Sequence, residues 1–339
     1  MKISAKLFFV FLIGLLFGSP VFAQQPDDDV VKVDTSFVRL NVGVVNAQGR
    51  PITNLNQQNF TVYEDDVKQN IARFEPTAAP FSLVLLLDVS GSTKPIRQLI
   101  SQTAARFIDA LPPETRIAVI TFNDKTDVLT DFTVERKKVF YAVSLIESQK
   151  KGGDTMLYKA LDFSLDKLKN EGKRRKAIVV LTDGIDTELE ADDRRTVTMA
   201  KAETAQTAVA AVQPEQNSKL IRVLNNADKE EVTIYPLALP SGDPARIPDP
   251  LPFQVAKYTA ARDRLQILAN RTGGTMNAIN RLEDTGKLYA SVAAELGALY
   301  SVEYQSSNEP KRSGKWRAIR IEVNSPELIV KTRPGYYAK

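Results

Sequence analysis

FSLVLLLDVSGST, residues 81–93, is the stretch that decides the fold. Its apolar run, residues 83–87, ends at Asp88, and two hydroxyls follow at Ser90 and Ser92. A continuous apolar run that a polar turn ends is typical of a strand buried on both faces, as in a parallel sheet covered by helices. Asp88 is then expected at the carboxyl end of the strand, the edge where open α/β sheets place their ligand sites.

The Asp-x-Ser-x-Ser pattern of this turn favours metal binding. It places one carboxylate and two hydroxyls within reach of a single point. Hard divalent cations prefer oxygen ligands of this kind. The alternative interpretation is that these are ordinary cap and turn residues.

The pattern resembles the metal-ion-dependent adhesion site of von Willebrand factor type A domains. In that site a Thr and a second Asp from two later loops join Asp-x-Ser-x-Ser. Thr155 lies in GGDTMLYKAL, between a Gly turn and an amphipathic helix, and Asp183 ends a second apolar run in KAIVVLTDGIDT. The resemblance therefore implies a metal site made of Asp88, Ser90, Ser92, Thr155 and Asp183.

The resemblance also implies what such a site holds. Two carboxylates balance a divalent cation, which is expected to be Mg²⁺, with Mn²⁺ or Ca²⁺ as alternatives. Some of the five side chains would act through water, and one position would stay open for a Glu or Asp carboxylate of a partner protein. GGDT departs from the commoner Gly-Gly-Thr by Asp154, which either adds a carboxylate near the metal or points away.

Further segments extend the resemblance over nearly all of the mature chain. The segments LTDGIDT, GGDTMLYKAL, YPLALPSGDP and GYYAK together look like bacterial proteins related to the von Willebrand factor type A family, of the Acidobacterial type. Proteins of that type are exported, which agrees with the amino terminus of this chain.

Residues 1–23 read as a secretory signal peptide. Lys2 and Lys6 precede an apolar stretch, residues 7–17, and Val21-Phe22-Ala23 offers a cleavage site. The stretch is shorter than the roughly 20 residues that a membrane-spanning helix needs. We expect cleavage after Ala23, no transmembrane span in the mature chain, and export to the periplasm or the cell surface; an uncleaved amino-terminal anchor is the alternative.

Composition excludes several classes of function. The chain has 339 residues, 43% hydrophobic, and a formal charge of +4, which falls to about +2 without Lys2 and Lys6. This balance argues against nucleic acid as a partner. Cys and His are absent, which removes thiolate and Ser-His-Asp nucleophiles, the usual zinc ligands and disulfides.

The basic run at 173–176 is expected to form a solvated turn.

The pattern of apolar residues predicts the domain organisation. Strands and helices alternate over 79–300, which predicts a Rossmann-like α/β domain with a mostly parallel central sheet. Period-two alternation in 24–78 and 301–339 predicts strands that combine into a small flanking β-sandwich. Residues 265–269 are expected to begin a helix that Gly273-Gly274 ends. Segments 187–216 and 240–252 are expected as long loops at the metal-bearing edge, used for partner recognition or present as plain insertions.

Three functions remain open at this point. The first is an exported, non-enzymatic, metal-dependent protein-binding module of the adhesion type. The second is a metal-dependent enzyme for hydrolysis or phosphoryl transfer, although the sequence has no Walker or dinucleotide glycine signature and no general base beyond the metal ligands. The third is a structural assembly subunit whose cation only stabilises loops. The oligomeric state is open.

Overall fold

The computed structural model describes residues 37–76, 81–148, 153–172, 174–279, 285–308 and 314–338. The signal peptide predicted at 1–23 and its cleavage site lie outside the described residues. Among the described residues, no helix is long and apolar enough to span a bilayer.

A six-stranded sheet lies at the centre, in the order β10-β9-β8-β5-β6-β7. All its pairings are parallel except that of β7 with β6. Every residue of β5 is buried, which explains why the apolar run in this strand shows no alternation. The strands are β5 (Phe81–Asp88), β6 (Arg116–Phe122), β7 (Thr126–Thr133), β8 (Arg175–Thr182), β9 (Val232–Ala238) and β10 (Asn277–Ala278).

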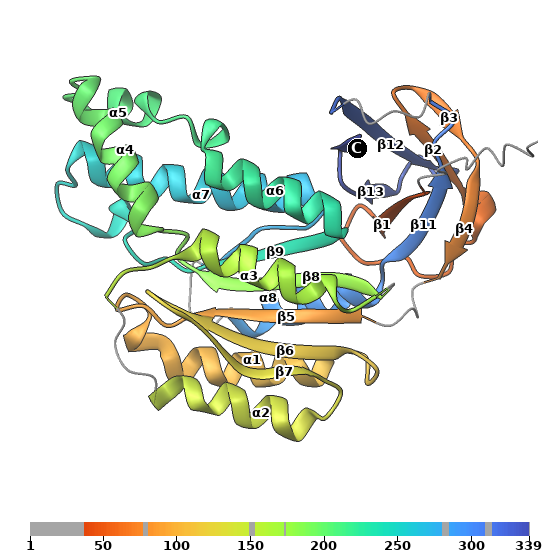
Figure 1. Ribbon diagram of the computed structural model, residues 1–339, viewed down its shortest axis with the longest axis horizontal. Helices are drawn as coiled ribbons and strands as arrows, with labels where there is room; N and C mark the ends of the chain where they lie inside the picture. Colours follow the sequence, from red (N-terminus) through yellow and green to blue (C-terminus); the bar gives the residue numbers. More distant parts are fainter. Residues whose placement is uncertain are drawn as a thin grey trace, which may run out of the picture. The chain divides into compact units, whose positions relative to one another are not determined.

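Helices cover both faces of this sheet (Figure 1). Leu83, Leu85 and Leu87 point to one face, and Val84 and Leu86 to the other. The first face packs against α1 (Arg97–Ala110), α2 (Arg136–Ser144) and α8 (Thr285–Gly297). The second face packs against α3 (Leu157–Lys169), α6 (Ser218–Glu230) and α7 (Pro252–Thr272). The predicted Rossmann-like α/β fold is confirmed.

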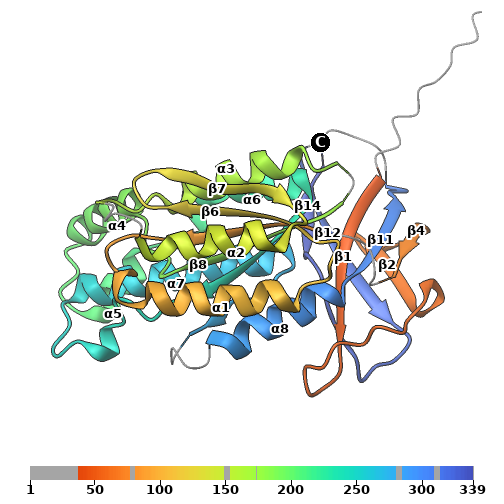
Figure 2. The ribbon, with the colours of Figure 1, turned by 90° about the horizontal axis from the view of Figure 1, so that it is seen from below.

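The two ends of the chain together form two antiparallel sheets with the strand orders β13-β1-β11-β4 and β14-β12-β2-β3 (Figure 2). Their inner faces share one hydrophobic core. The predicted combination of terminal strands is confirmed. The strands are β1 (Phe37–Val45), β2 (Phe60–Glu64), β3 (Val67–Gln69), β4 (Ile71–Glu75), β11 (Tyr300–Gln305), β12 (Trp316–Val323), β13 (Ile329–Lys331) and β14 (Gly335–Tyr337).

A buried carboxylate ties these two ends of the chain together. Glu64, at the end of β2, has no exposed surface. It accepts hydrogen bonds from Tyr304 at 2.6 Å and Tyr336 at 2.9 Å. Ser306 at 2.6 Å and Asn308 at 2.9 Å donate to its other oxygen. All four donors are neutral and come from the carboxy-terminal segment, so Glu64 joins the two ends of the chain through hydrogen bonds alone.

The expectation of a long loop at 187–216 is wrong. The segment forms α4 (Thr187–Met199), α5 (Ala205–Ala211) and a 3₁₀ turn, Pro214–Gln216. Asp186 caps α4 by accepting from the backbone N–H groups of its first turn. Ala208 of α5 packs against Ala256 and Ala260 of α7. The Ala-rich composition therefore reflects close helix packing, and a recognition role for the segment stays a prediction.

Two helices differ from the expectation in the segments that follow. α6 was not predicted, and Asn217 caps its first turn. α7 begins at Pro252, well before residue 265, because proline is favoured in the first turn of a helix. Most of 240–252 is irregular as expected, with a short 3₁₀ turn at Pro244–Arg246. The predicted end of α7 is correct, with Gly273 at φ 81°.

The expectation of a solvated turn at 173–176 is wrong for two of its residues. Arg175 and Lys176 are buried in β8, and Lys173 lies outside the described residues. The guanidinium of Arg175 stacks over Phe81 at 4.3 Å and donates to the carbonyl of Leu299. Burial lowers the pKa of Arg175 to about 10. Arg175 and Lys176 are therefore part of the domain core.

Candidate metal centre

The predicted ligands lie at the carboxyl edge of the central sheet. Asp88 ends β5, and Ser90 and Ser92 follow in the turn that leads to α1. Asp183 follows β8, which pairs in parallel with β5 and places Leu181 opposite Leu87. Because both strands leave the sheet at the same edge, their polar ends meet.

Hydrogen bonds connect four of the five predicted residues. Ser92 Oγ donates to Asp183 Oδ2 at 2.9 Å. The hydroxyls of Ser90 and Ser92 lie 3.0 Å apart, and the backbone N–H of Ser90 donates to Asp88 Oδ1 at 2.9 Å. The two segments therefore form one continuous cluster of oxygen atoms.

Thr155 joins this region by a different route. Its backbone N–H donates to Thr187 Oγ1 at 2.9 Å, and the backbone N–H of Thr187 donates back to the Thr155 carbonyl at 2.9 Å. Thr187 belongs to the segment that follows Asp183. Among the hydrogen bonds of the described residues, none joins Thr155 directly to the other four predicted ligands.

Asp154 does not supply a third carboxylate. Its side chain is exposed. Within the described ranges, no group of three or more Asp, Glu, His or Cys side chains is placed to hold a metal ion. Any cation at this edge would depend on two carboxylates, Asp88 and Asp183, together with hydroxyl and water oxygens.

Two further residues, which sequence reasoning missed, fix the ligands. Thr182 Oγ1 donates to Asp88 Oδ2 at 2.8 Å and accepts from the backbone N–H of Gly184 at 3.0 Å. Arg97, on the first turn of α1, donates to the carbonyls of Val89 and of Ser90, the latter at 3.3 Å. The pairing of β5 with β8 places Thr182 beside Asp88, so only a known register would have identified it.

Burial dominates the electrostatics of the two carboxylates. Asp88 has no exposed surface and Asp183 is 3% exposed. Burial, and next the charge of Asp183, raise the pKa of Asp88 to about 7. Burial likewise raises the pKa of Asp183. Two buried carboxylates that repel each other require either a proton or a cation between them.

The donor set fits a hard divalent cation. Its atoms are carboxylate and hydroxyl oxygens, which Mg²⁺ prefers to the nitrogen and sulfur ligands typical of zinc. The two carboxylates match the charge of one divalent ion. Ser92 is exposed whereas Asp88 and Asp183 are buried, so the cluster meets solvent on the Ser92 side.

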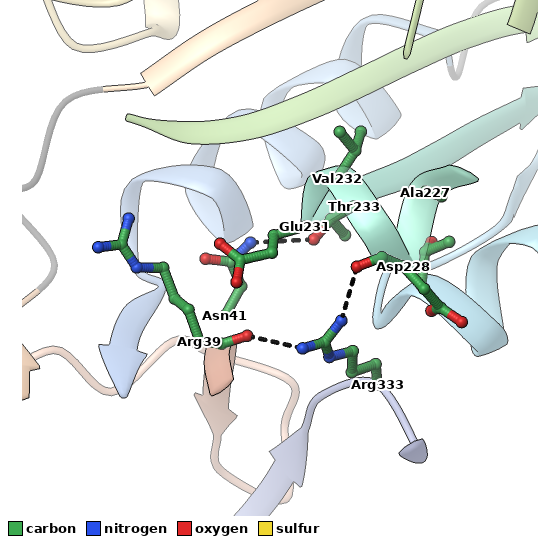
Figure 3. A pocket seen from close by; sticks show the side chains of 9 residues that line it. Arg39, Asn41, Ala227, Asp228, Glu231, Val232, Thr233 and Arg333 are labelled. Carbon is green, nitrogen blue, oxygen red and sulfur yellow. Dashed lines mark hydrogen bonds between the residues drawn. The ribbon is translucent and has the colours of Figure 1, made fainter. Parts of the chain in front are cut away.

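A polar pocket lies between β1 and the corner that joins α6 to β9 (Figure 3). Arg333 donates to the carbonyls of Arg39 at 3.0 Å and Asp228 at 3.3 Å. Asn41 Nδ2 donates to Thr233 Oγ1 at 3.2 Å. The cavity of about 10 Å³ has room for one water molecule. It is a junction between the sandwich and the central domain rather than a ligand site.

Residues 82–238 match the family model of the von Willebrand factor type A domain. This chain contains a von Willebrand factor type A domain. The matched range runs from β5 to the last residue of β9 and includes all five predicted ligands. The family assignment made from the sequence is therefore confirmed, whereas the narrower resemblance to the Acidobacterial type stays a prediction.

Several solved structures are similar to parts of this chain at low sequence identity. One is a von Willebrand factor type A protein from Catenulispora acidiphila (12% identity, 91% of this chain and 75% of that chain, TM-score 0.46). Another is an aerotolerance-related membrane protein from Bacteroides fragilis (11% identity, 64% of this chain and 98% of that chain, TM-score 0.41). A third is proximal thread matrix protein 1 from the mussel byssus, with a zinc-occupied MIDAS motif (15% identity, 68% of this chain and 49% of that chain, TM-score 0.44). No curated protein sequence matches the chain.

Proposed function

We propose that this chain is a metal-dependent protein-binding module. In this proposal Mg²⁺, held by Asp88, Ser90, Ser92, Thr155 and Asp183, accepts a Glu or Asp carboxylate from a partner protein. The observation that carries the proposal is the Ser92–Asp183 hydrogen bond, which joins the two ligand-bearing loops into one cluster. The von Willebrand factor type A domain supports it, because such domains mediate protein interactions.

Each residue of the cluster has a distinct role in this proposal. Asp88 and Asp183 supply the negative charge, and Ser90 and Ser92 supply neutral oxygens. Thr155 would complete the set from the loop that is tied to Thr187. When bound, Mg²⁺ supplies an electrophilic position that attracts an anionic ligand. Because the hydroxyls are uncharged, the two carboxylates only balance the charge of the ion and leave it able to bind another acid.

The exposure of the cluster gives the partner an approach. Asp88 and Asp183 are shielded from water, whereas Ser92 is exposed. A ligand would therefore enter from the Ser92 side, past the turn between β5 and α1. The carboxylates that hold the ion would stay inside the domain.

The proposed module is not an enzyme. The sequence contains no His or Cys, and both buried carboxylates are assigned to the ion, which leaves no separate general base. Purified protein with Mg²⁺ is expected to give no turnover of p-nitrophenyl phosphate. Turnover that disappears in Asp88→Asn would contradict this part of the proposal.

Export is the second part of the proposal that needs its own test. The predicted signal peptide, residues 1–23, would direct the chain to the periplasm or the cell surface. Amino-terminal sequencing of the protein recovered from an envelope fraction should begin at Gln24. A sequence that begins at Met1 would contradict cleavage.

An affinity capture from envelope extract tests partner binding. The immobilised chain should retain a protein partner in Mg²⁺ and release it in chelator, and Asp88→Ala should retain none. Asp162→Asn is the matched control, because Asp162 pairs with Arg222 on the helical face rather than in the cluster. A partner retained both in chelator and by Asp88→Ala would reject the proposal.

A further inference from the structure

Arg262, on α7, forms no ion pair with an acidic side chain among the residues that the structure describes. Its Nη2 donates to the carbonyl of Leu239, and its guanidinium lies over the ring of Tyr258 at 4.8 Å. Its Nε and Nη1 are buried and have no hydrogen-bond partner among the described residues. By contrast, the neighbouring Arg264 makes a two-point ion pair with Asp193 at 2.6 and 2.7 Å.

The backbone around Arg262 lies against the loop of the candidate metal centre. Leu239, whose carbonyl Arg262 binds, donates its own N–H to the carbonyl of Thr182 at 2.8 Å. Gly184, at φ 84°, lies so close to α7 that a Cβ there would meet Leu265 Cδ1 at 2.8 Å and the carbonyl of Ala261 at 3.2 Å. Arg262 therefore comes next in sequence after Ala261, where α7 touches the loop that carries Asp183.

The charge of Arg262 acts on the metal centre. Leu239 links Arg262 to Thr182, which hydrogen-bonds to Asp88 and directly precedes Asp183, so Arg262 is connected to the loop of the metal centre. Lys257, also on α7, is the other cation whose charge reaches Asp183. Lys257 lies 3.4 Å from the carboxylate of Glu190, which also pairs with Arg194 at 3.0 Å. Among the described residues, Arg262 is thus the cation that acts on Asp183 without an acidic partner of its own.

We propose that Arg262 is a specificity-determining residue that keeps the metal-loaded site electropositive and so selects an acidic ligand. This inference rests on the proposed function. A divalent ion balances Asp88 and Asp183, and Arg262 then leaves an excess of positive charge. The same charge repels the incoming metal ion and attracts an anion, and both effects gain strength because Nε and Nη1 of the guanidinium are shielded from water.

Removing the charge should therefore move two affinities in opposite directions. In Arg262→Gln, Mn²⁺ should bind roughly threefold to tenfold more tightly, as measured by the loss of the free Mn²⁺ electron paramagnetic resonance signal. Acetate should bind the Mn²⁺-loaded protein about two- to threefold more weakly, as measured by paramagnetic broadening of its carbon-13 resonance. Arg262→Lys keeps the charge and should keep both affinities near those of the wild type.

Arg320→Gln is the matched control, because Arg320 stacks on Tyr63 in the sandwich and should change neither affinity. If Arg262→Gln and Arg262→Lys weaken both affinities together, the residue has only a packing role and the inference is wrong. Affinities for both probes that stay unchanged in Arg262→Gln would also overturn it. A wild-type protein that binds no Mn²⁺ would reject the proposed function itself, and this inference with it.

Discussion

Ser92 Oγ donates a hydrogen bond to Asp183 Oδ2 at 2.9 Å, across 91 residues of sequence. This contact brings the end of β5 and the end of β8 to one point, although Asp88 and Asp183 repel each other in a buried setting. The protein therefore keeps an arrangement that is unfavourable without a cation. Stability of the metal-free fold and metal binding therefore make opposite demands on this pair of carboxylates.

Asp183→Asn is expected to stabilise the metal-free protein. The substitution removes one of two buried like charges and keeps an acceptor oxygen for Ser92, whereas the backbone N–H of Ile185 loses its acceptor. The lost repulsion outweighs the lost hydrogen bond, so the free energy of unfolding in chelator should rise by on the order of 1 kcal/mol. The same variant should lose the rise in melting temperature that Mg²⁺ gives the wild type. Urea unfolding with chelator or Mg²⁺ measures both effects. A variant that is less stable than the wild type in chelator would show that the charge of Asp183 does not destabilise the metal-free protein.

The metal-free protein should lose stability as the pH rises from about 4 to about 7. The pKa of Asp88 is raised from 3.8 to about 7, so the folded state binds more protons than the unfolded state in this range. The contribution is present at the acidic end and is lost as Asp88 ionises. Mg²⁺ at pH 8 should restore stability, because it takes the place of the proton.

The pH dependence has a direct control. Asp88→Asn cannot ionise and should flatten the fall in unfolding free energy between pH 4 and 7, as followed by urea unfolding across the range. Mg²⁺ affinity of the wild type should weaken as the pH falls below 7, because protons compete for the carboxylates. If the unfolding free energy of the metal-free wild type changes between pH 4 and pH 7 in the same way as that of Asp88→Asn, then Asp88 has an ordinary pKa.

Much of this arrangement was predictable from the sequence because its signals are local. The buried run before Asp88 and the second run before Asp183 each predict a strand end at one sheet edge, and Gly273 marks the end of α7 correctly. Alternation at both termini predicted the sandwich. Each pattern reflects burial. A strand buried on both faces is apolar throughout, and a strand buried on one face alternates between apolar and polar residues.

The parts that the sequence did not predict depend on packing partners. The Ala-rich segment 187–216 has weak amphipathic periodicity, and its helices are stabilised by contacts with α7 that only the fold supplies. Thr182 depends on the β5–β8 register, and Arg262 on where α7 crosses the loop of Gly184. Arg175 looked like part of a charged turn because its partner Phe81 is distant in sequence.

Thr187→Val tests how Thr155 is held. The substitution removes the Oγ1 acceptor of the Thr155 backbone N–H, and loss of a supporting contact to a metal ligand typically lowers metal affinity about 10–100-fold. Calorimetric titration with Mg²⁺ measures the change. Thr196→Val, on the exposed side of the same helix, is the control and should keep wild-type affinity. Equal affinities in the two variants would mean that the Thr187 side chain does not support a metal ligand.

Glu64→Ala tests the sandwich separately from the metal centre. It leaves Tyr304 and its neighbours without their shared acceptor, which should lower the free energy of unfolding by about 1–3 kcal/mol or more. Mg²⁺ affinity at the sheet edge should not change. A variant as stable as the wild type in urea would show that the buried carboxylate does not hold the two ends together.

Whether the two strand ends hold a cation is decided by calorimetric titration of Mg²⁺ into the chelator-treated wild-type chain. We expect saturable binding of a single ion per chain at pH 8, and no binding in Asp88→Ala. A wild type that shows no binding, or an Asp88→Ala variant that binds as the wild type does, would contradict it.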